Sequence, residues 1–247
     1  MGNKSSKRTY KRRFYHCETY NTLAVNNSLD KNGTGNLIEK RLSKTYLTIA
    51  SALEYCYSSV LQQHFTITLP DDFPAEIDIK DLYKRFKDKL DRDWRLNNNK
   101  RRKLFYIATI EKEKSKKCHI HFMTFTDSNV NTAIGVINLI EEAWKHAINH
   151  QFIVNDDLLD LELYKKGLVH YKTNEEYGIE KYQHLINKHN FESISQAMFW
   201  ASYLCKNRKG TDLDKFKSSS VSKTAGQFMS DMLNKWQTAS KPSALKK

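Results

Sequence analysis

The stretch LFYIATIEKEKSKKCHIHFMTF, residues 104–125, contains two apolar segments separated by a short charged connector. LFYIATIE (104–111) and CHIHFMTF (118–125) have the length and the aromatic and β-branched content of strands. A connector as short and polar as EKSKK favours a hairpin of adjacent antiparallel strands. We expect this hairpin to form the centre of the fold.

Helical and extended patterns alternate on both sides of this hairpin. Apolar residues spaced by three and four predict a helix within 36–60, and HFTITLP (64–70) predicts a strand that ends at Pro70. Further helices are predicted over 78–94, 131–148 and 191–207, with a weaker strand signal within 161–173. Together these patterns indicate an α+β domain, with helices packed on a central, mainly antiparallel β-sheet.

The chain divides into three parts by composition. Residues 1–35 are rich in Lys, Arg, Asn and Ser and are predicted to be a basic flexible arm. Residues 36–210 form a single predicted domain that includes the helix within 36–60. Residues 211–247 are predicted to be a basic tail, with a short amphipathic helix at FMSDMLNKW (228–236).

The charge of the chain points to a polyanionic partner. Its 247 residues carry a formal net charge of +13 at pH 7, which favours nucleic acid over an anionic membrane surface or a charge excess serving solubility alone. No apolar stretch is long enough to span a bilayer, and the basic N-terminus is not followed by the apolar core of a signal peptide. The four scattered cysteines suggest reduced thiols. We therefore expect a soluble, cytoplasmic protein.

A candidate metal site lies on the predicted hairpin. His119 and His121 are two residues apart on a strand, so their imidazoles project from one face. Glu111 lies directly across a tight hairpin from His119, and Glu113 shares its face as the reserve candidate. Two histidines and one carboxylate leave coordination positions open, as a catalytic metal requires. A zinc finger is disfavoured because Cys118 points to the other face and no second Cys/His pair stands at finger spacing.

A candidate nucleophile lies on the last long helix. Tyr203 and Lys206 in SYLCK are three residues apart and would share one face of that helix. A phenol attacks a phosphodiester when a cation neutralises the phosphate, and Lys206 brings positive charge to the pair. Taken by itself, such a pair is more often an ordinary tyrosine beside a solvated lysine.

The order FTITLP, then Glu111 with HIH, then YLCK resembles the three motifs of the HUH (His-hydrophobe-His) endonucleases. Within that superfamily, the YxxK tyrosine and its ASYLCK context are most similar to the inovirus-type, filamentous-phage rolling-circle replication initiators. The resemblance covers roughly residues 64–208. It implies an HUH nuclease domain with a ferredoxin- or RRM-like sheet.

The resemblance also implies an activity. Such enzymes nick and rejoin single-stranded DNA at a specific site through a 5′-phosphotyrosine intermediate, and so start rolling-circle replication of a phage, plasmid or other mobile element. A divalent ion, Mg²⁺ or Mn²⁺, is implied, although the bare ligand set would also accept Zn²⁺. The residue roles implied are metal ligands at His119 and His121, a third ligand at Glu111, the nucleophile at Tyr203 and the motif lysine at Lys206.

The expected partner is single-stranded DNA or an origin hairpin. Phe199, one turn before Tyr203, is a candidate for stacking on a base. The basic residues expected near the site are Arg101, Arg102, Lys103, Lys116 and Lys117. No GxxxxGK[ST] loop occurs, so a host helicase would have to unwind the DNA. No second tyrosine accompanies Tyr203 at helical spacing, and we expect a monomer or weak dimer.

Two other functions remain open from the residues. A DNA-binding module without catalysis would use the basic surface and leave HIH incidental. A metallonuclease with two histidines and one carboxylate would use bound water, with Tyr203 serving only the structure.

Overall fold

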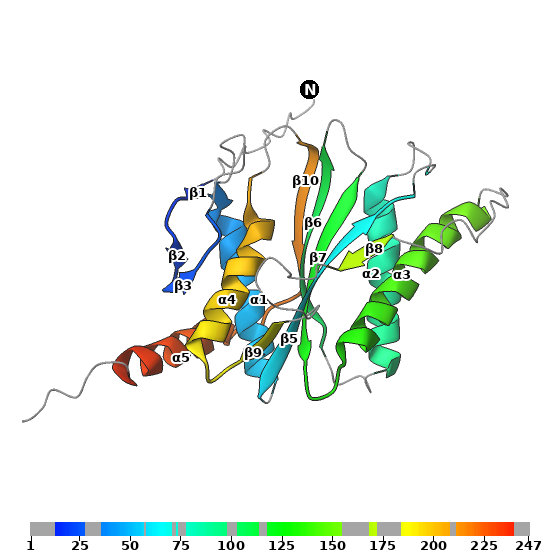
Figure 1. Cartoon of the computed structure of the whole chain (residues 1–247). Helices are drawn as coiled ribbons and strands as arrows, with labels where there is room; N and C mark the ends of the chain where they lie inside the picture. Colours follow the sequence, from blue (N-terminus) through cyan, green and yellow to red (C-terminus); the bar gives the residue numbers. More distant parts are fainter. Residues whose placement is uncertain are drawn as a thin grey trace, which may run out of the picture.

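A six-stranded antiparallel β-sheet with helices on both faces forms the centre of the computed structural model (Figure 1). This arrangement confirms the α+β prediction. The structure describes residues 13–27, 36–56, 58–70, 73, 78–97, 103–113, 118–154, 168–171, 184–207 and 211–239.

The sheet is ordered β10-β6-β7-β5-β8, and β9 pairs with the half of β5 that β8 leaves uncovered. All of these pairs are antiparallel. The predicted hairpin is the β6–β7 pair in the middle of the sheet. The strands are β5 Ser59–Thr68, β6 Phe105–Glu113, β7 His119–Asp127, β8 Val169–Tyr171, β9 His184–Asn187 and β10 Thr211–Ser218.

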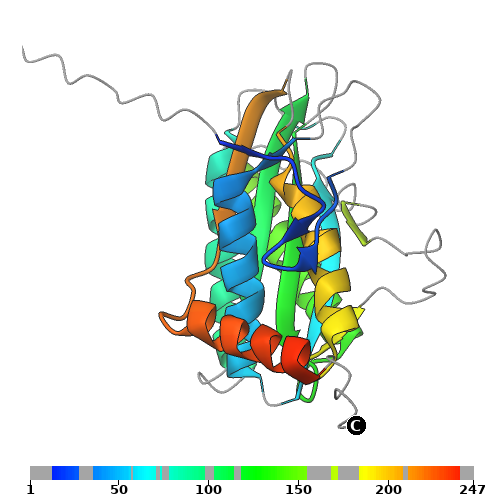
Figure 2. The same cartoon turned by 90° about the vertical axis from the view of Figure 1, so that its left-hand side faces the viewer.

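Two groups of helices cover the two faces of the sheet. Helices α2 and α3 lie together on one face, and α1 and α4 lie on the other, where α5 crosses α1 (Figures 1 and 2). None of the described helices is long and apolar enough to cross a membrane. The helices are α1 Glu39–Tyr55, α2 Ile79–Asn97, α3 Ala133–Val154, α4 Phe191–Ser202 and α5 Ala225–Ala239.

Alternation along the central strands separates two hydrophobic cores. On β7, Ile120 and Phe122 belong to the core under α2 and α3, whereas Met123 and Phe125 belong to the core under α1 and α4. All four side chains are at most 1% exposed. Full burial of each such side chain contributes about 1.5–3 kcal/mol, so both cores hold β7 in one register. His121 shares the face of Met123, which is the α1/α4 face.

The N-terminal segment is not a free arm throughout. Residues 13–27 contain β1 Phe14–Tyr15, β2 Thr19–Tyr20 and β3 Leu23–Ala24, and β1 pairs with β4 Leu37–Ile38. Leu23 is fully buried in the α1/α4 core, and the backbone N–H of Ala24 donates to Ser195 Oγ at 3.0 Å. A short apolar LAV segment therefore packs on α4, contrary to the flexible arm predicted for it. Residues 1–12 and 28–35 lie outside the described part.

The C-terminal segment is also part of the domain. The predicted short helix is present as α5, and Met229 and Leu233 of that helix are buried. The residues predicted to be a tail before it form β10, which pairs with β6 at one edge of the sheet. Alternating lysines along β10 suit an exposed edge strand, because their charge discourages further strand pairing. Residues 240–247 lie outside the described part.

Candidate metal and tyrosine site

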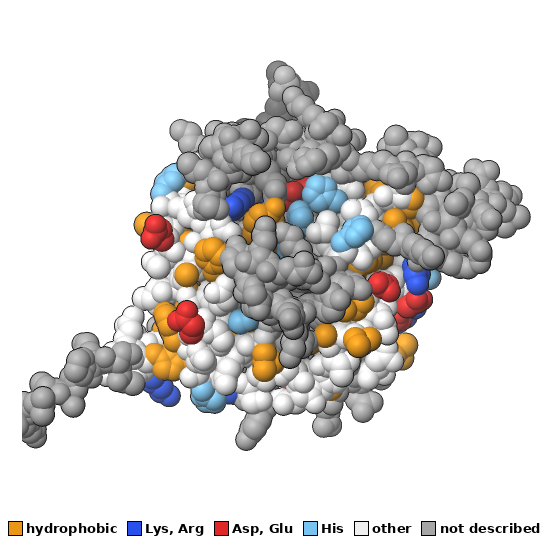
Figure 3. All heavy atoms as spheres, in the orientation of Figure 1, with side chains coloured by type: hydrophobic (Ala, Val, Ile, Leu, Met, Phe, Trp, Pro, Cys, Tyr) orange, Lys and Arg blue, Asp and Glu red, His pale blue; other side chains and the backbone are white. Residues whose placement is uncertain are grey.

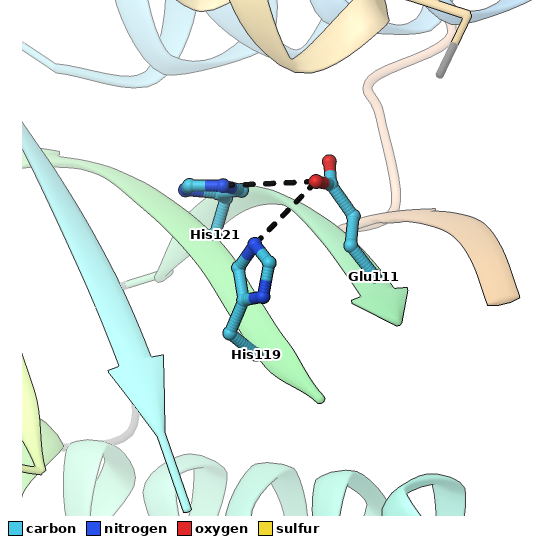
Figure 4. A group of neighbouring side chains, drawn as sticks. All are labelled: Glu111, His119 and His121. Atoms are coloured by element: carbon cyan, nitrogen blue, oxygen red, sulfur yellow. Dashed lines mark ion pairs between the residues drawn. The ribbon is translucent and has the colours of Figure 1, made fainter. Parts of the chain in front are cut away.

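The glutamate and the two histidines predicted as metal ligands meet on the α1/α4 face of the sheet (Figure 4). Glu111 on β6 pairs directly with His119 on β7, as the hairpin spacing predicts. Nε2 of His119 lies 3.5 Å and Nε2 of His121 lies 3.8 Å from the same oxygen, Oε2 of Glu111. One ligand atom from each residue lies within 4.8 Å of the others.

This geometry fits a divalent cation. Ligand atoms that are each about 2.1 Å from one ion lie roughly 3.0–3.5 Å apart, close to the separations seen here. Glu111 is fully buried, and a buried carboxylate needs nearby positive charge to offset its desolvation. A cation bound by Glu111, His119 and His121 would supply that charge and keep coordination positions for a substrate oxygen. The backbone of Glu113 pairs with Thr211 and lies nearer the hairpin turn, and its side chain is outside the described part.

Strand β5 contributes two residues to the site that the sequence analysis did not single out. Thr66 pairs with His121 across the β5–β7 ladder, and its Oγ1 lies 3.3 Å from His121 Nδ1. That hydrogen bond fixes the imidazole so that Nε2 faces Glu111, as an outer-shell partner of a metal ligand does. The ring of His64 lies 5.5 Å from that of His121. Residues two apart on a strand share a face, so the sequence could have placed His64 on the same face of β5 as Thr66.

Tyr203 lies beside these histidines. Its ring is perpendicular to that of His121 with 5.9 Å between centroids, and it lies 6.4 Å from the ring of His64. Nζ of Lys206 is 5.3 Å from the centre of the Tyr203 ring. His119 remains 15% exposed, and Figure 3 shows a group of histidine side chains beside an acidic one at the surface. The structure thus gathers the predicted ligands, nucleophile and lysine in one place.

The local structure around Tyr203 differs from the prediction. The helix expected over 191–207 ends at Ser202, and Tyr203–Cys205 form a 3₁₀ turn, η2. Lys206 is extended and forms a β-bridge with Leu37. Tyr203 and Lys206 therefore do not share a face of a regular helix. The tighter turn brings the lysine over the tyrosine ring instead.

Hydrogen bonds from the neighbouring elements hold this turn against the sheet. The hydroxyl of Thr109, on the Glu111 face of β6, donates to the carbonyl of Leu204 at 3.0 Å. Arg41 of α1 donates to the carbonyl of Lys206 at 3.2 Å. Cys205 Sγ contacts Thr45 Oγ1, and its complete burial raises the pKa of the thiol to about 12, so it stays protonated. The backbone that carries Tyr203 is therefore fixed from both the sheet and α1.

One protein family matches most of the elements described above. The model of the YagK/YfjJ C-terminal domain matches residues 18–219, well over half of the chain. The chain belongs to the YagK/YfjJ C-terminal domain family. No curated protein and no solved structure matches the chain.

The match includes every residue of the metal and tyrosine site. In this YagK/YfjJ domain the matched segment begins just before β2 and ends just after β10, so the family pattern includes β2, β3 and the edge strand β10. These strands lie outside the domain bounds of 36–210 that the composition suggests.

The basic residues predicted to contact DNA are not brought to the metal site within the described part of this YagK/YfjJ domain. Arg101, Arg102, Lys116 and Lys117 lie outside the described part. Lys103 is exposed, but it precedes β6 at the end opposite Glu111, about 25 Å away along the strand. The expectation that Lys103 lies near the site is therefore wrong. Lys103 and Glu111 are close in sequence, but they lie at opposite ends of the extended strand β6. Phe199 is half-buried on α4, one turn before Tyr203.

Proposed function

We propose that this protein is a metal-dependent endonuclease of the HUH type, which nicks and rejoins single-stranded DNA through Tyr203. In this role it would start rolling-circle replication of a phage, plasmid or other mobile element. The observation that carries the proposal is the ring contact between Tyr203 and His121, residues far apart in the chain. A phenol held beside a two-histidine, one-carboxylate site is what a tyrosine nucleophile requires.

The proposed reaction is a transfer of one phosphodiester bond. A divalent ion, Mg²⁺ or Mn²⁺, would polarise the scissile phosphoryl oxygen when bound. Tyr203 Oη attacks the phosphorus, and its proton passes to solvent. The bond from phosphorus to the 3′ oxygen breaks, and that oxygen takes up a proton to leave as a free 3′ hydroxyl. The 5′ phosphate stays on Tyr203, and attack by a 3′ hydroxyl in the reverse direction rejoins the strand.

The residues have separate roles in this scheme. Glu111, His119 and His121 would hold the cation, with Thr66 orienting His121. Lys206 carries positive charge beside the phenol, where negative charge gathers as the phosphate is attacked. The hydrogen bond from Thr109 to Leu204 keeps Tyr203 on the ligand face, which limits the reorganisation needed for attack. Single-stranded or hairpin DNA would be the substrate, with unwinding left to a host helicase.

A denaturing gel assay tests this function. Labelled single-stranded oligonucleotides covering the origin of the encoding element would be incubated with Mn²⁺ or Mg²⁺ and wild type, Tyr203→Phe, His119→Ala or Tyr106→Phe. Tyr106 lies on the opposite face of β6, packed against Phe122, and serves as the matched tyrosine control. We expect a covalent protein–DNA band with wild type and Tyr106→Phe, and none with the other two variants.

The other outcomes identify the rival functions. Metal-dependent cleavage without an adduct, unchanged in Tyr203→Phe, would indicate a metallonuclease that uses bound water. DNA that is bound but uncut across the whole origin region would indicate a binding module without catalysis. Either result would replace the proposal.

A further inference from the structure

A groove of about 380 Å³ lies between α2 and the edge strand β10. It is on the α2/α3 side of the sheet, the face opposite Tyr203. Two aspartates, Asp81 and Asp88, contribute to its lining together with Tyr83 and Ile110. Five lysines form the rest of the lining: Lys80, Lys84, Lys87, Lys215 and Lys217.

Two periodicities bring these lysines together. Lys80, Lys84 and Lys87 are spaced by four and three along α2, so they form one stripe beside its buried face. Lys215 and Lys217 are two apart on β10 and pair with Ile110 and Ala108 of the α2/α3 core. These two lysines therefore point to the α2 side of the sheet. The groove is formed by the lysine stripe of α2 on one side and by the edge strand β10 on the other.

Among the described residues, lysines outnumber aspartates at the groove. Asp78 Oδ2 lies 3.4 Å from Lys80 Nζ, and Asp91 forms an ion pair with Lys87. Lys84, Lys215 and Lys217 then remain beside the two lining aspartates, which leaves an excess of one positive charge. Desolvation and the neighbouring Lys80 ammonium lower the pKa of Lys215. Ammonium groups crowded in this way repel one another, and an anion placed between them would remove that repulsion.

We propose that this groove binds the phosphodiester backbone of a nucleic-acid strand, as a second contact site apart from Tyr203. Lysine ammonium groups are point-charge partners of phosphates. Tyr83 is 7% exposed, so this lining aromatic offers no platform for a base. The groove therefore holds the backbone without reading sequence.

The position of the groove suggests which nucleic acid it holds. Lys215 pairs with Ile110 and its neighbour Asp214 pairs with Glu111, so the groove and the metal site lie at the same level along β10 and β6. Only the edge formed by β10 separates them in the described structure. A strand held at Tyr203 that passes around this edge reaches Lys215 and Lys217. That path, which rests on the proposed function, assigns the groove to DNA flanking the nick.

Binding without cleavage tests the groove by itself. Fluorescence anisotropy would measure the Kd of a labelled single-stranded oligonucleotide of about 20 nucleotides. All proteins would carry Tyr203→Phe, with EDTA present, so that no cutting occurs. The groove variant is Lys80→Gln/Lys84→Gln/Lys217→Gln. The control is Lys145→Gln/Lys223→Gln/Lys235→Gln, which removes equal charge from α3 and from the α5 region.

Salt dependence gives the decisive number. Losing three phosphate contacts should lower the slope of log Kd against log salt by about 2 and weaken binding about 10- to 100-fold at 0.1 M salt. The control variant should keep the slope of the parent. Equal losses of affinity in both variants would show that only the net charge matters, and would contradict a binding site in the groove. Unchanged affinity in the groove variant would contradict it as well. A loss confined to the groove variant supports the site even if wild type fails to nick DNA, so the two proposals are tested separately.

Discussion

The ring of Tyr203 stands perpendicular to the ring of His121, with 5.9 Å between their centroids. The two residues come from different layers of the domain, His121 from the central strand β7 and Tyr203 from the turn after α4. Their contact joins a candidate nucleophile to a candidate metal site. Each part of this arrangement can be changed separately.

Metal binding should stabilise the fold through the three predicted ligands. A divalent ion at 100 times its Kd adds about 2.7 kcal/mol to the free energy of unfolding, which raises the Tm of a chain of this size by about 5–10 °C. Thermal denaturation with and without Mn²⁺ measures this shift. Glu111→Gln and His119→Ala should abolish it, whereas Glu142→Gln, an exposed acid on α3, should retain it. A shift of the same size in Glu111→Gln would rule out this site.

Thr66 should tune the metal site without belonging to it. Thr66→Val removes the hydroxyl 3.3 Å from His121 Nδ1 and leaves the shape of the side chain nearly unchanged. Loss of such an outer-shell partner weakens metal affinity by about 10- to 100-fold. Isothermal titration with Mn²⁺ would measure it, with Thr124→Val, a buried threonine on the opposite face of β7, as the matched control. Equal affinity in the two variants would show that Thr66 does not orient His121.

Thr109 should position Tyr203 without affecting the metal. Thr109→Val leaves the buried carbonyl of Leu204 without its donor, at a cost of about 1–3 kcal/mol in stability. The turn that carries Tyr203 then loses its link to β6, so the rate of adduct formation should fall while Mn²⁺ affinity stays constant.

Single-turnover adduct formation and titration calorimetry separate these two effects. Thr124→Val is the matched control, because the buried Thr124 hydroxyl has no hydrogen-bond partner within the described structure. An unchanged adduct rate in Thr109→Val would show that this hydrogen bond does not position the nucleophile.

Much of the fold follows from local patterns in the sequence. Alternation along β6 and β7 and a short connector were sufficient to place Glu111 opposite His119, because a tight hairpin leaves little choice of register. The contact of β10 with β6 was not predictable in this way. Its residues are polar and lysine-rich, and pairing across about a hundred residues leaves no local signal in an exposed edge strand.

The sequence predicted which side chains share a face of each strand, but not which strands and turns come together at the site. The alternation that placed His119 and His121 on one face also places His64 and Thr66 on one face of β5, but nothing in the residues alone brings β5 beside β7. The contact of Tyr203 with His121 depends on the end of α4 at Ser202. Apolar periodicity continues through Leu204, so it does not mark that end.

His184 should make stability depend on pH. Burial lowers its pKa in the folded protein, where the imidazole lies against Trp200 and Nε2 is 2.8 Å from the Ser193 carbonyl. Below the unfolded pKa of about 6.5, the unfolded chain takes up a proton that the folded chain resists, so stability falls as the pH is lowered. Urea denaturation at pH 7.5 and 5.5 should show a smaller loss in His184→Gln than in wild type. Identical losses would show that His184 does not contribute.

The covalent bond to Tyr203 is the most direct test of the proposed function. An oligonucleotide spanning the nick site, labelled on one side or the other of the scissile phosphate, would be trapped with wild-type protein and Mn²⁺, digested with protease and analysed by tandem mass spectrometry. We predict that the label 3′ of the scissile phosphate stays with the protein and that the modified peptide carries a 5′-phosphate ester on Tyr203. A free 5′ phosphate in the cleaved product with no modified tyrosine, or an adduct on a different residue, would contradict this account.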